Sequence, residues 1–537
     1  MLHKGVDPNE LIKELSEEEK KNTLGEVDIL LNHQIQSRYR SQFQTSVTIP
    51  RYVVPEEGVE PEVAYRFISS DLDLDGKPGL NCASFVNTYC DDNMRQLTLD
   101  NLTKNLSDVD EYPAMMDIHA RCISFLSNLW HAPSGSSPIG SATTGSSEAI
   151  HLGGLAMKQR WRESRQAAGK DVSKPNIIMG ANAQVALEKF ARYFDVEARL
   201  VPVCEESHHC LDLTKVKDLL DENTIGVFCI LGSTYTGHFE PVEELAKLLD
   251  EYEAETGIDI PIHVDGASGA FIAPFVFPDL KWDFSIPRVV SINTSGHKFG
   301  LATAGLGWIV WRDESFLPKY LVFELKYLGG VEQSFTLNFS RPGFEVIQQY
   351  YLFLTLGREG FKYTHSSSMS NARLLSRLLE LSGYFEVVSD IHRKKGDFNT
   401  EPKNFFTSDE ATDFNYGLPV VAFKLSKKLK ADAPYLQQEM ISQLLRAKGY
   451  IIPNYPLPPS EGDVEILRVV VRQNMSADLV ASLVRDAIHV VEYLYSHNQN
   501  LTHAFNSASH MQQNKHHKLK PIKHPKGHRH GSYRGTC

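Results

Sequence analysis

A lysine and an aspartate lie in sequence settings that suit one kind of cofactor chemistry. Lys298 ends a Ser-Gly-His-Lys turn after the apolar run at 289–292, and Asp265 directly follows a candidate buried strand at 262–264. Pyridoxal phosphate needs a lysine amine for its Schiff base and an acid that keeps its ring nitrogen protonated. A lone lysine is usually a surface residue and a lone aspartate often caps a turn, but the two together, each after a strand, predict an enzyme that uses this cofactor.

A third segment suits a phosphate group. Ser146 and Ser147 follow a loop rich in serine, glycine and threonine at 134–144 and are expected to open a helix. The first turn of a helix offers free backbone N–H groups and the positive end of the helix dipole. Ordinary helix capping is the alternative for this serine pair. The P-loop pattern is absent from the sequence, which argues against a nucleoside triphosphate as the ligand.

Short apolar runs alternate with helical stretches over residues 84–362, which indicates an α/β fold. Five runs are predicted as buried strands, at 176–179, 198–203, 225–230, 262–264 and 289–292. Near-continuous apolar strands with helical crossovers indicate a large, mostly parallel sheet covered on both faces. Ligands bind at the carboxyl ends of the strands in such sheets, and this is where Asp265 and Lys298 fall.

The chain is expected to divide into four regions. Residues 1–60 would form an N-terminal helical arm, 61–362 the large cofactor-binding domain, 363–497 a small C-terminal α+β domain, and 498–537 a basic, histidine-rich flexible tail. Further expected elements are strands at 418–423 and 466–471, a long helix near 343–362, an amphipathic helix near 476–497 and a surface loop at 394–416.

Three interpretations of the tail stay open. The simplest is a disordered basic segment. Its histidines could also bind metal adventitiously, although they lack a fixed ligand spacing and no metal site is predicted. The third is a regulatory segment that closes the active site or binds calmodulin. Calmodulin as a partner has weak support, because Pro521, Pro525 and Gly527 interrupt any amphipathic helix.

Composition and charge narrow the function classes. The 537 residues are 42% hydrophobic and 23% charged, which suffices for two or three domains with a large core. The net charge of −12 argues against general affinity for nucleic acid or an anionic membrane. No secretory segment and no apolar run of roughly 20 residues is present. The seven cysteines lack CxxC spacing, so reduced thiols and a cytoplasmic location are expected.

These segments together resemble the glutamate decarboxylases of bacteria, plants and fungi, within the group II pyridoxal-phosphate-dependent amino-acid decarboxylases. The resemblance spans roughly residues 60–495 and is carried by 81–85, 111–113, 129–133, 145–149, 189–193, 234–237, 265–269, 295–300, 338–342 and 467–469. It implies the fold of the pyridoxal-phosphate-dependent transferases (fold type I), with pyridoxal 5'-phosphate as the cofactor. It also implies L-glutamate as the substrate, 4-aminobutanoate and CO2 as the products, and a homo-oligomer of at least two subunits.

The resemblance implies a role for each of several cofactor contacts. Lys298 would form the Schiff base, Asp265 would pair with the ring nitrogen, and Gln184 would lie against the ring face. The residues expected to bind the phosphate are Ser146, Ser147, Ser295 and His297, with Ser340 added from the neighbouring subunit. Thr234 and Ala267 would line the cofactor. Lys298 or His297 would donate the proton that the substrate's α-carbon gains after CO2 has left.

Four further positions match the family's substrate contacts. Ser84, Phe85 and Asp108 would hold the distal carboxylate, and Arg468 would bind a substrate carboxylate. Ser84 stands where bacterial relatives have threonine, which changes the pocket volume but keeps a hydroxyl. An ionised Asp108 would repel the substrate's carboxylate, so we expect the two groups to share one proton.

Two alternatives to glutamate decarboxylation stay open. The first is a related decarboxylase that acts on another acidic amino acid, aspartate or cysteine sulfinate; an aromatic substrate suits Asp108 and Arg468 poorly. The second belongs to a different class, a catalytically silent relative that serves as a scaffold or a binding protein. Retention of Lys298 and Asp265 argues against it.

Overall fold

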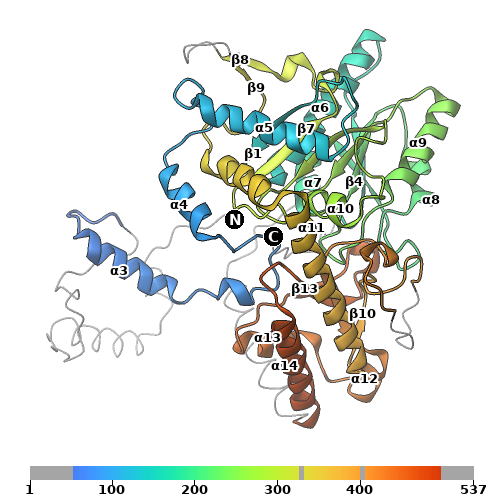
Figure 1. Ribbon diagram of the computed structural model, residues 1–537. Helices are drawn as coiled ribbons and strands as arrows, with labels where there is room; N and C mark the ends of the chain where they lie inside the picture. Colours follow the sequence, from blue (N-terminus) through green and yellow to red (C-terminus); the bar gives the residue numbers. More distant parts are fainter. Residues whose placement is uncertain (1–52, 326–331, 399–405, 498–537) are drawn as a thin grey trace, which may run out of the picture. The chain divides into compact units, whose positions relative to one another are not determined.

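The computed structural model describes residues 53–325, 332–398 and 406–497 (Figure 1). The chain divides into two compact units, and the boundary along the sequence lies between Gly76 and Lys77. The described part of the first unit contains one helix, α3 (Pro61–Leu72), which begins at a proline and buries none of its residues. An exposed ion pair joins Arg66 Nε to Glu62 Oε1 at 2.9 Å. Most of the expected arm at 1–60 and the whole tail at 498–537 lie outside the described residues.

The second unit is built around a seven-stranded sheet with the order β1-β7-β6-β5-β4-β2-β3. Its strands are β1 (Ile139–Thr143), β2 (Asn176–Gly180), β3 (Glu197–Val201), β4 (Thr224–Ile230), β5 (Ile262–Asp265), β6 (Val289–Thr294) and β7 (Gly307–Trp311). Strands β3, β2, β4, β5 and β6 pair in parallel, and β7 is antiparallel to both β1 and β6. The five predicted strands and the mostly parallel α/β sheet are therefore confirmed.

Helices cover both faces of this sheet, as the alternation of side chains along β4 shows. Phe228 packs on Phe190 of α7 with ring centroids 5.5 Å apart, whereas Val227 lies in the core that contains Leu245 and Leu249 of α9. The helices of this part are α4 (Asp92–Asp100), α5 (Pro113–Leu129), α6 (Ser146–Ala167), α7 (Val185–Tyr193), α8 (Leu213–Val216), α9 (Val242–Thr256) and α10 (Ala273–Val276). Burial on both faces explains why the strands are almost continuously apolar.

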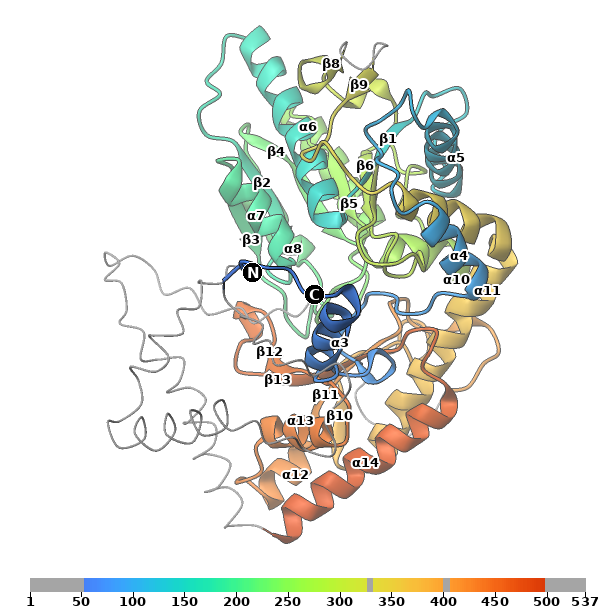
Figure 2. The same cartoon turned by 90° about the vertical axis from the view of Figure 1, so that its left-hand side faces the viewer.

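A smaller antiparallel sheet, β10-β11-β13-β12, lies below the large one in Figure 2, next to helices α12 to α14. Its strands are β10 (Phe385–Val387), β11 (Val420–Leu425), β12 (Asn454–Pro456) and β13 (Glu465–Val470). The helices are α12 (Lys427–Asp432), α13 (Gln438–Ala447) and α14 (Ala477–Ser496). The strands expected at 418–423 and 466–471 and the amphipathic helix near 476–497 are thus confirmed. A two-stranded ribbon, β8 (Phe323–Leu325) and β9 (Glu332–Ser334), completes the described strands.

The long helix α11 (Phe344–Leu381) joins the two sheets. Its first part packs on α4 and α5, and its second part packs on α14 and β10. The helix changes direction at Gly357, where φ is 56° and ψ is −168°. The predicted helix near 343–362 is confirmed but extends to Leu381, so the proposed boundary after residue 362 falls within it. No helix in the described ranges is long and apolar enough to cross a membrane.

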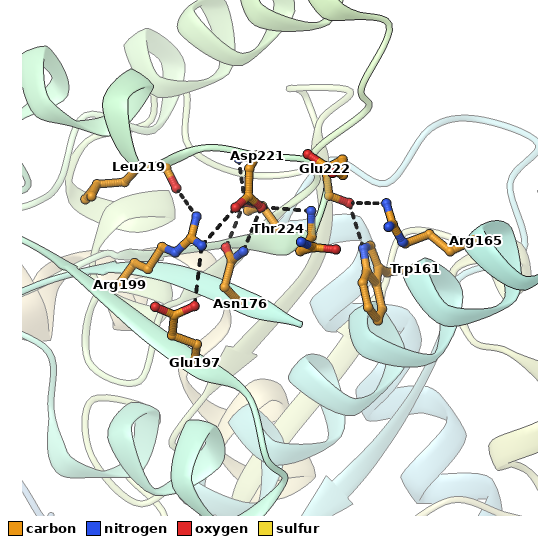
Figure 3. A network of polar contacts seen from close by, with 10 residues as sticks. Trp161, Arg165, Asn176, Glu197, Arg199, Leu219, Asp221, Glu222 and Thr224 are labelled. Carbon is orange, nitrogen blue, oxygen red and sulfur yellow. Dashed lines mark hydrogen bonds and ion pairs between the residues drawn. The ribbon is translucent and has the colours of Figure 1, made fainter. Parts of the chain in front are cut away.

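Polar side chains pair with one another near the amino-terminal ends of strands in the large sheet (Figure 3). Asn176 Nδ2, at the start of β2, donates to Asp221 Oδ1 at 2.8 Å. The other carboxylate oxygen of Asp221 pairs with Arg199 Nη2 of β3 at 2.8 Å. Trp161 Nε1 and Arg165 Nη1 both donate to the carbonyl of Glu222. These polar groups therefore find their partners within the fold.

Candidate active site

The carboxyl ends of β5 and β6 bring the predicted lysine and aspartate to one edge of the sheet. Asp265 is the last residue of β5 and pairs in register with Asn293 of β6. The chain leaves β6 after Thr294 and reaches Lys298 within one turn. Lys298 Nζ donates to the hydroxyl of Ser268, which follows β5, at 3.3 Å. Parallel pairing of two adjacent strands thus places both groups together, as expected for this fold class.

The Asp265 carboxylate is buried, at 4% exposure, and held by neutral donors. Its Oδ1 accepts from Asn293 Nδ2 at 2.9 Å and from the backbone N–H of Ala267 at 3.1 Å. No hydrogen bond from the described residues reaches Oδ2. A buried carboxylate needs a partner for its charge, so Oδ2 is suited to a ligand cation such as a protonated ring nitrogen.

Behind Asn293 lies a fully buried histidine, His263 of β5. Its Nε2 lies 2.7 Å from Asn293 Oδ1 and its Nδ1 lies 2.7 Å from Ser291 Oγ. Burial lowers the pKa of His263 to about 4, so the ring is neutral near pH 7. Because Asn293 gives its amide N–H to Asp265, its carbonyl oxygen must accept the Nε2 proton. The tautomer of His263 follows from this arrangement.

A candidate phosphate site lies where α6 begins. Ser146 is the first residue of α6, and its Oγ accepts from Ser295 Oγ at 2.8 Å. The preceding Gly145 has φ 147°, and a Cβ there would lie 3.4 Å from His297 Cε1. Ser147 is exposed at the same helix start. The loop therefore needs glycine to bring the helix N-terminus close to His297.

His297 supplies an unsatisfied polar atom at this place. Its Nδ1 is buried and has no hydrogen-bond partner within the described ranges. Burial, together with the charge of Lys298, lowers the pKa of His297 to about 4. A buried polar atom without a partner is costly. A phosphate at the start of α6 would meet this need, and hence the residues present fit pyridoxal phosphate.

The opposite side of Lys298 contains an aromatic ring and a buried cation. Lys298 Nζ lies 5.3 Å from the centre of the Phe85 ring, and Arg468 Cζ lies 4.9 Å from it. Arg468, on β13, donates to the carbonyls of Thr234 and Ala83. Its Nε is buried without a partner and, among the described residues, no carboxylate pairs with it. This arrangement suits a ligand carboxylate.

Three predicted residues have local contacts beside this centre. Ser84 Oγ accepts from the backbone N–H of Val86 at 3.1 Å, directly before Phe85. Gln184 caps α7, where its side chain accepts from the N–H of Ala186 at 2.7 Å. Ala267 contacts Asp265 and, through its carbonyl, the N–H of Ser295 at 3.1 Å. Among the described residues, Gln184 makes no hydrogen bond to residues 295–303, the segment that carries Lys298 and is called the lysine segment below.

Asp108 and Ser340 form a separate group. The backbone N–H of Asp108 donates to the carbonyl of Asn105 at 3.2 Å, and Asn105 Nδ2 donates to Ser340 Oγ at 3.4 Å. Ser340 is exposed. In the part of the chain that the structure describes, no hydrogen bond or ion pair joins either residue to Lys298, Phe85 or Arg468. The structure thus brings the predicted residues together as two groups.

Sequence reasoning missed the amides that hold the lysine segment. Asn87 Nδ2 donates to the carbonyl of Leu301 at 2.6 Å, and Gln349 Nε2 of α11 donates to that of Gly300 at 3.0 Å. A small cavity beside Lys298 is lined in part by Asn87 and His365. An asparagine in a loop and a glutamine within a helix carry no sequence signal for such a role, because their partners are distant along the chain.

Comparison with known proteins identifies similar enzymes. Residues 85–398 match the family described as the pyridoxal-dependent decarboxylase conserved domain. A glutamate decarboxylase of Saccharomyces cerevisiae is 50% identical, over 86% of this chain and 82% of the relative. One from Aliivibrio fischeri is 40% identical, over 85% and 92%. The solved structure of a Lactobacillus brevis glutamate decarboxylase superimposes with a TM-score of 0.76 at 35% identity, covering 84% of this chain and 96% of that chain.

Proposed function

We propose, from the premise that this chain belongs to the pyridoxal-dependent decarboxylase family, that it removes the α-carboxyl group of L-glutamate and releases 4-aminobutanoate and CO2. One observation of the structure carries the proposal: Arg468, a buried guanidinium with no carboxylate partner among the described residues, shares the Phe85 ring with Lys298. The cation can bind an acidic substrate next to the lysine amine. The curated relatives that are similar over most of the chain are glutamate decarboxylases, which supports this substrate.

The cofactor is pyridoxal 5'-phosphate. We assign Lys298 to its aldehyde carbon and Asp265 Oδ2 to its ring nitrogen. We assign the binding of its phosphate to Ser146, Ser147, Ser295 and His297. Gln184, Thr234 and Ala267 would line the rest of the cofactor. When bound, the cofactor supplies an electron-withdrawing ring that accepts the electron pair left as CO2 departs. The protein's own residues orient the substrate, exclude water and supply the proton.

The substrate's orientation is assigned to the residues around Phe85. Ser84 and Phe85 would hold the distal carboxylate and Arg468 a substrate carboxylate, so that the bond to be broken is fixed relative to Lys298. Burial of Phe85 and Arg468, each 2% exposed, keeps water away from the α-carboxylate. Exclusion of water from the carboxylate favours its loss as neutral CO2.

The substrate's α-carbon must then gain a proton in place of the carboxyl group that has left. We assign this step to Lys298 Nζ. His297 is the other candidate, but its pKa is lowered to about 4, so its ring holds only one, weakly acidic proton near neutral pH. The net reaction consumes one proton for each glutamate.

We also propose that the protein is a homo-oligomer of at least two subunits in the cytoplasm. Ser340 is exposed and lies beside the loop of Asp108, apart from the residues around Lys298. Both side chains would therefore complete the site of a neighbouring subunit. The six described cysteines are free thiols, consistent with a reducing compartment.

An amine-product assay tests the function. The purified chain, saturated with pyridoxal 5'-phosphate, is incubated in turn with L-glutamate, L-aspartate and L-cysteine sulfinate, and the amine products are separated by chromatography. We expect 4-aminobutanoate from glutamate at a rate at least about 100-fold above the rates for the other two, because Ser84, Phe85 and Arg468 fix the distance between two carboxylates. The Lys298→Ala variant is the matched control and should form no product. Faster turnover of aspartate or cysteine sulfinate, or equal turnover by the control, would refute the proposal.

A further inference from the structure

The segment that carries Lys298 contains a residue in an unfavourable backbone conformation. Leu301 has φ 68°, in the left-handed region that residues with a Cβ rarely adopt. It is buried at 6% exposure, and its N–H donates to the carbonyl of Lys298 at 3.1 Å. Such a conformation persists only where surrounding contacts impose it, and it is common near active sites. Contacts to the Leu301 backbone therefore determine where Lys298 lies.

Asn87 supplies contacts on both sides of Lys298. Its backbone N–H donates to the carbonyl of His297 at 2.8 Å, and its side-chain Nδ2 donates to the carbonyl of Leu301 at 2.6 Å. The same Nδ2 also donates to the carbonyl of Tyr89 at 2.7 Å. Asn87 is buried, at 7% exposure, so these bonds form away from water, where their loss is costly.

The remaining atom of the Asn87 amide reaches the C-terminal part of the fold. Oδ1 accepts from Gln473 Nε2 at 2.9 Å. Gln473 follows β13, the strand that carries Arg468, and the adjacent Arg472 donates to the carbonyl of Val86 at 2.6 Å. Asn87 itself lies two residues after Phe85. One amide thus connects the Phe85 loop, the lysine segment and the end of β13.

Helix α11 holds the lysine segment at other points but makes no such connection. Gln349 Nε2 donates to the carbonyl of Gly300 at 3.0 Å, and Gln348 Oε1 accepts from the N–H of Thr303 at 3.0 Å. These bonds attach the segment to α11. Within the described residues, only the hydrogen bonds of Asn87 join the lysine segment to the loop that carries Phe85.

We propose that Asn87 is a positioning residue that holds Leu301 in its left-handed conformation and thereby fixes Lys298 Nζ relative to Phe85 and Arg468. The inference rests on the proposed function for the identity of the reaction, but its physical content is the placement of the Lys298 amine. Loss of the Nδ2 donor should let Leu301 relax and move Lys298. The Phe85 loop should stay in place, because Arg468 and Arg472 still donate to its carbonyls.

The test uses Asn87→Asp, which keeps the shape of the side chain and replaces the donor by an acceptor. We expect kcat for L-glutamate to fall at least tenfold and KM to change less than threefold. We also expect Lys298 to react at least fivefold more slowly with added pyridoxal 5'-phosphate, measured as the borohydride-trapped adduct on the Lys298 peptide by mass spectrometry. Tyr89→Phe, an exposed neighbour in the same loop, is the matched control and should match the parent in all three.

A second substitution separates positioning from general damage. Glycine adopts left-handed conformations without steric cost. The double variant Asn87→Asp/Leu301→Gly should therefore have a kcat and a trapping rate at least threefold higher than those of Asn87→Asp alone. Asn87→Asp values within twofold of the parent, or a double variant no better than Asn87→Asp, would overturn the proposal. If thermal melting shows that Leu301→Gly does not fold, the trapping rate of Asn87→Asp decides alone. Trapping needs no substrate, so a parent enzyme that forms no 4-aminobutanoate would refute the proposed function without deciding this inference.

Discussion

At the scale of single residues, hydrogen bonds from neutral groups orient the Asp265 carboxylate. Asn293 donates to its Oδ1 at 2.9 Å, and His263 in turn donates to Asn293. The His263 ring is fixed from the other side by α6, where a Cβ on Gly153 would lie 2.6 Å from the ring. Since none of these groups carries charge near pH 7, the negative charge of Asp265 is left for a ligand cation. This is the condition that a carboxylate facing a pyridine nitrogen requires.

Replacement of Asn293 by aspartate should disrupt this arrangement. The new carboxylate would lie within hydrogen-bonding distance of Asp265, and two adjacent carboxylates share one proton rather than both being ionised. We expect the affinity for pyridoxal 5'-phosphate to fall by roughly tenfold or more, measured by spectroscopic titration of the cofactor-free protein. Asn293→Ser removes the same amide without adding charge and is the control. An Asp variant that binds the cofactor as tightly as the Ser variant would contradict this account.

The residues that sequence reasoning identified share a local signal. Lys298, Asp265, Ser146 and Ser295 each lie at the end of an apolar strand or the start of a helix, and the structure brings these four to one edge of the sheet. Asn87 has no such signal, because its partners Leu301 and Gln473 are 214 and 386 residues away along the chain. Contacts of this range depend on the complete fold and cannot be inferred from spacing.

At the scale of elements, α11 shows where local sequence patterns fail. The sequence analysis predicts a helix near 343–362, and the serines at 366–368, just beyond it, have low intrinsic helix propensity. The structure continues the helix because Ala372, Leu375 and Leu379 are buried, at no more than 1% exposure. Tertiary packing supplies most helical stability in proteins and here outweighs propensity.

The direction change in α11 depends on Gly357. With φ 56° and ψ −168° it occupies a backbone region that is essentially restricted to glycine. A Cβ there would meet nothing within 4 Å, so the backbone conformation, not space, is limiting. We expect Gly357→Ala to lower the free energy of unfolding by about 1–3 kcal/mol, measured by urea denaturation. The neighbouring, exposed Glu359→Ala should leave it within about 0.5 kcal/mol. Equal stability of the two variants would show that α11 can bend without Gly357.

At the scale of the whole molecule, buried titratable groups make stability depend on pH. Burial lowers the pKa of His119, His263 and His297 to about 4 and that of His365 to about 3. These histidines ordinarily titrate near 6.5, so between pH 6.5 and 4 the unfolded chain binds protons that the folded chain does not, and acid destabilises the fold. Glu240 and Glu345 act in the opposite direction, because burial raises their pKa to about 7.

The histidines outnumber the glutamates, so stability should fall as the pH is lowered from 6.5 to 4.5. We expect a slope of roughly 1–3 kcal/mol per pH unit, measured by denaturant unfolding across this range. His365 packs among Phe275, Phe299 and Phe361, which makes His365→Phe a suitable probe. This variant should flatten the slope, whereas substitution of the exposed His497 by Phe should not. A slope that is unchanged in His365→Phe, or stability that rises towards pH 4.5, would contradict the assignment.

Whether two subunits share each site can be decided by making hybrids. In a dimer with closed symmetry, residues that act across the interface belong to the partner's site. Lys298→Ala and Asp108→Ala subunits, each inactive alone, are given different affinity tags, co-expressed and purified through both tags. If Asp108 serves the partner, one of the two sites in a hybrid receives both defects and the other receives neither, so we expect about half of the parental activity. If Asp108 serves its own subunit, every site carries one defect and the hybrid stays inactive. Parental subunits carrying the same two tags give the reference activity, and an inactive hybrid would place Asp108 with the lysine of its own chain.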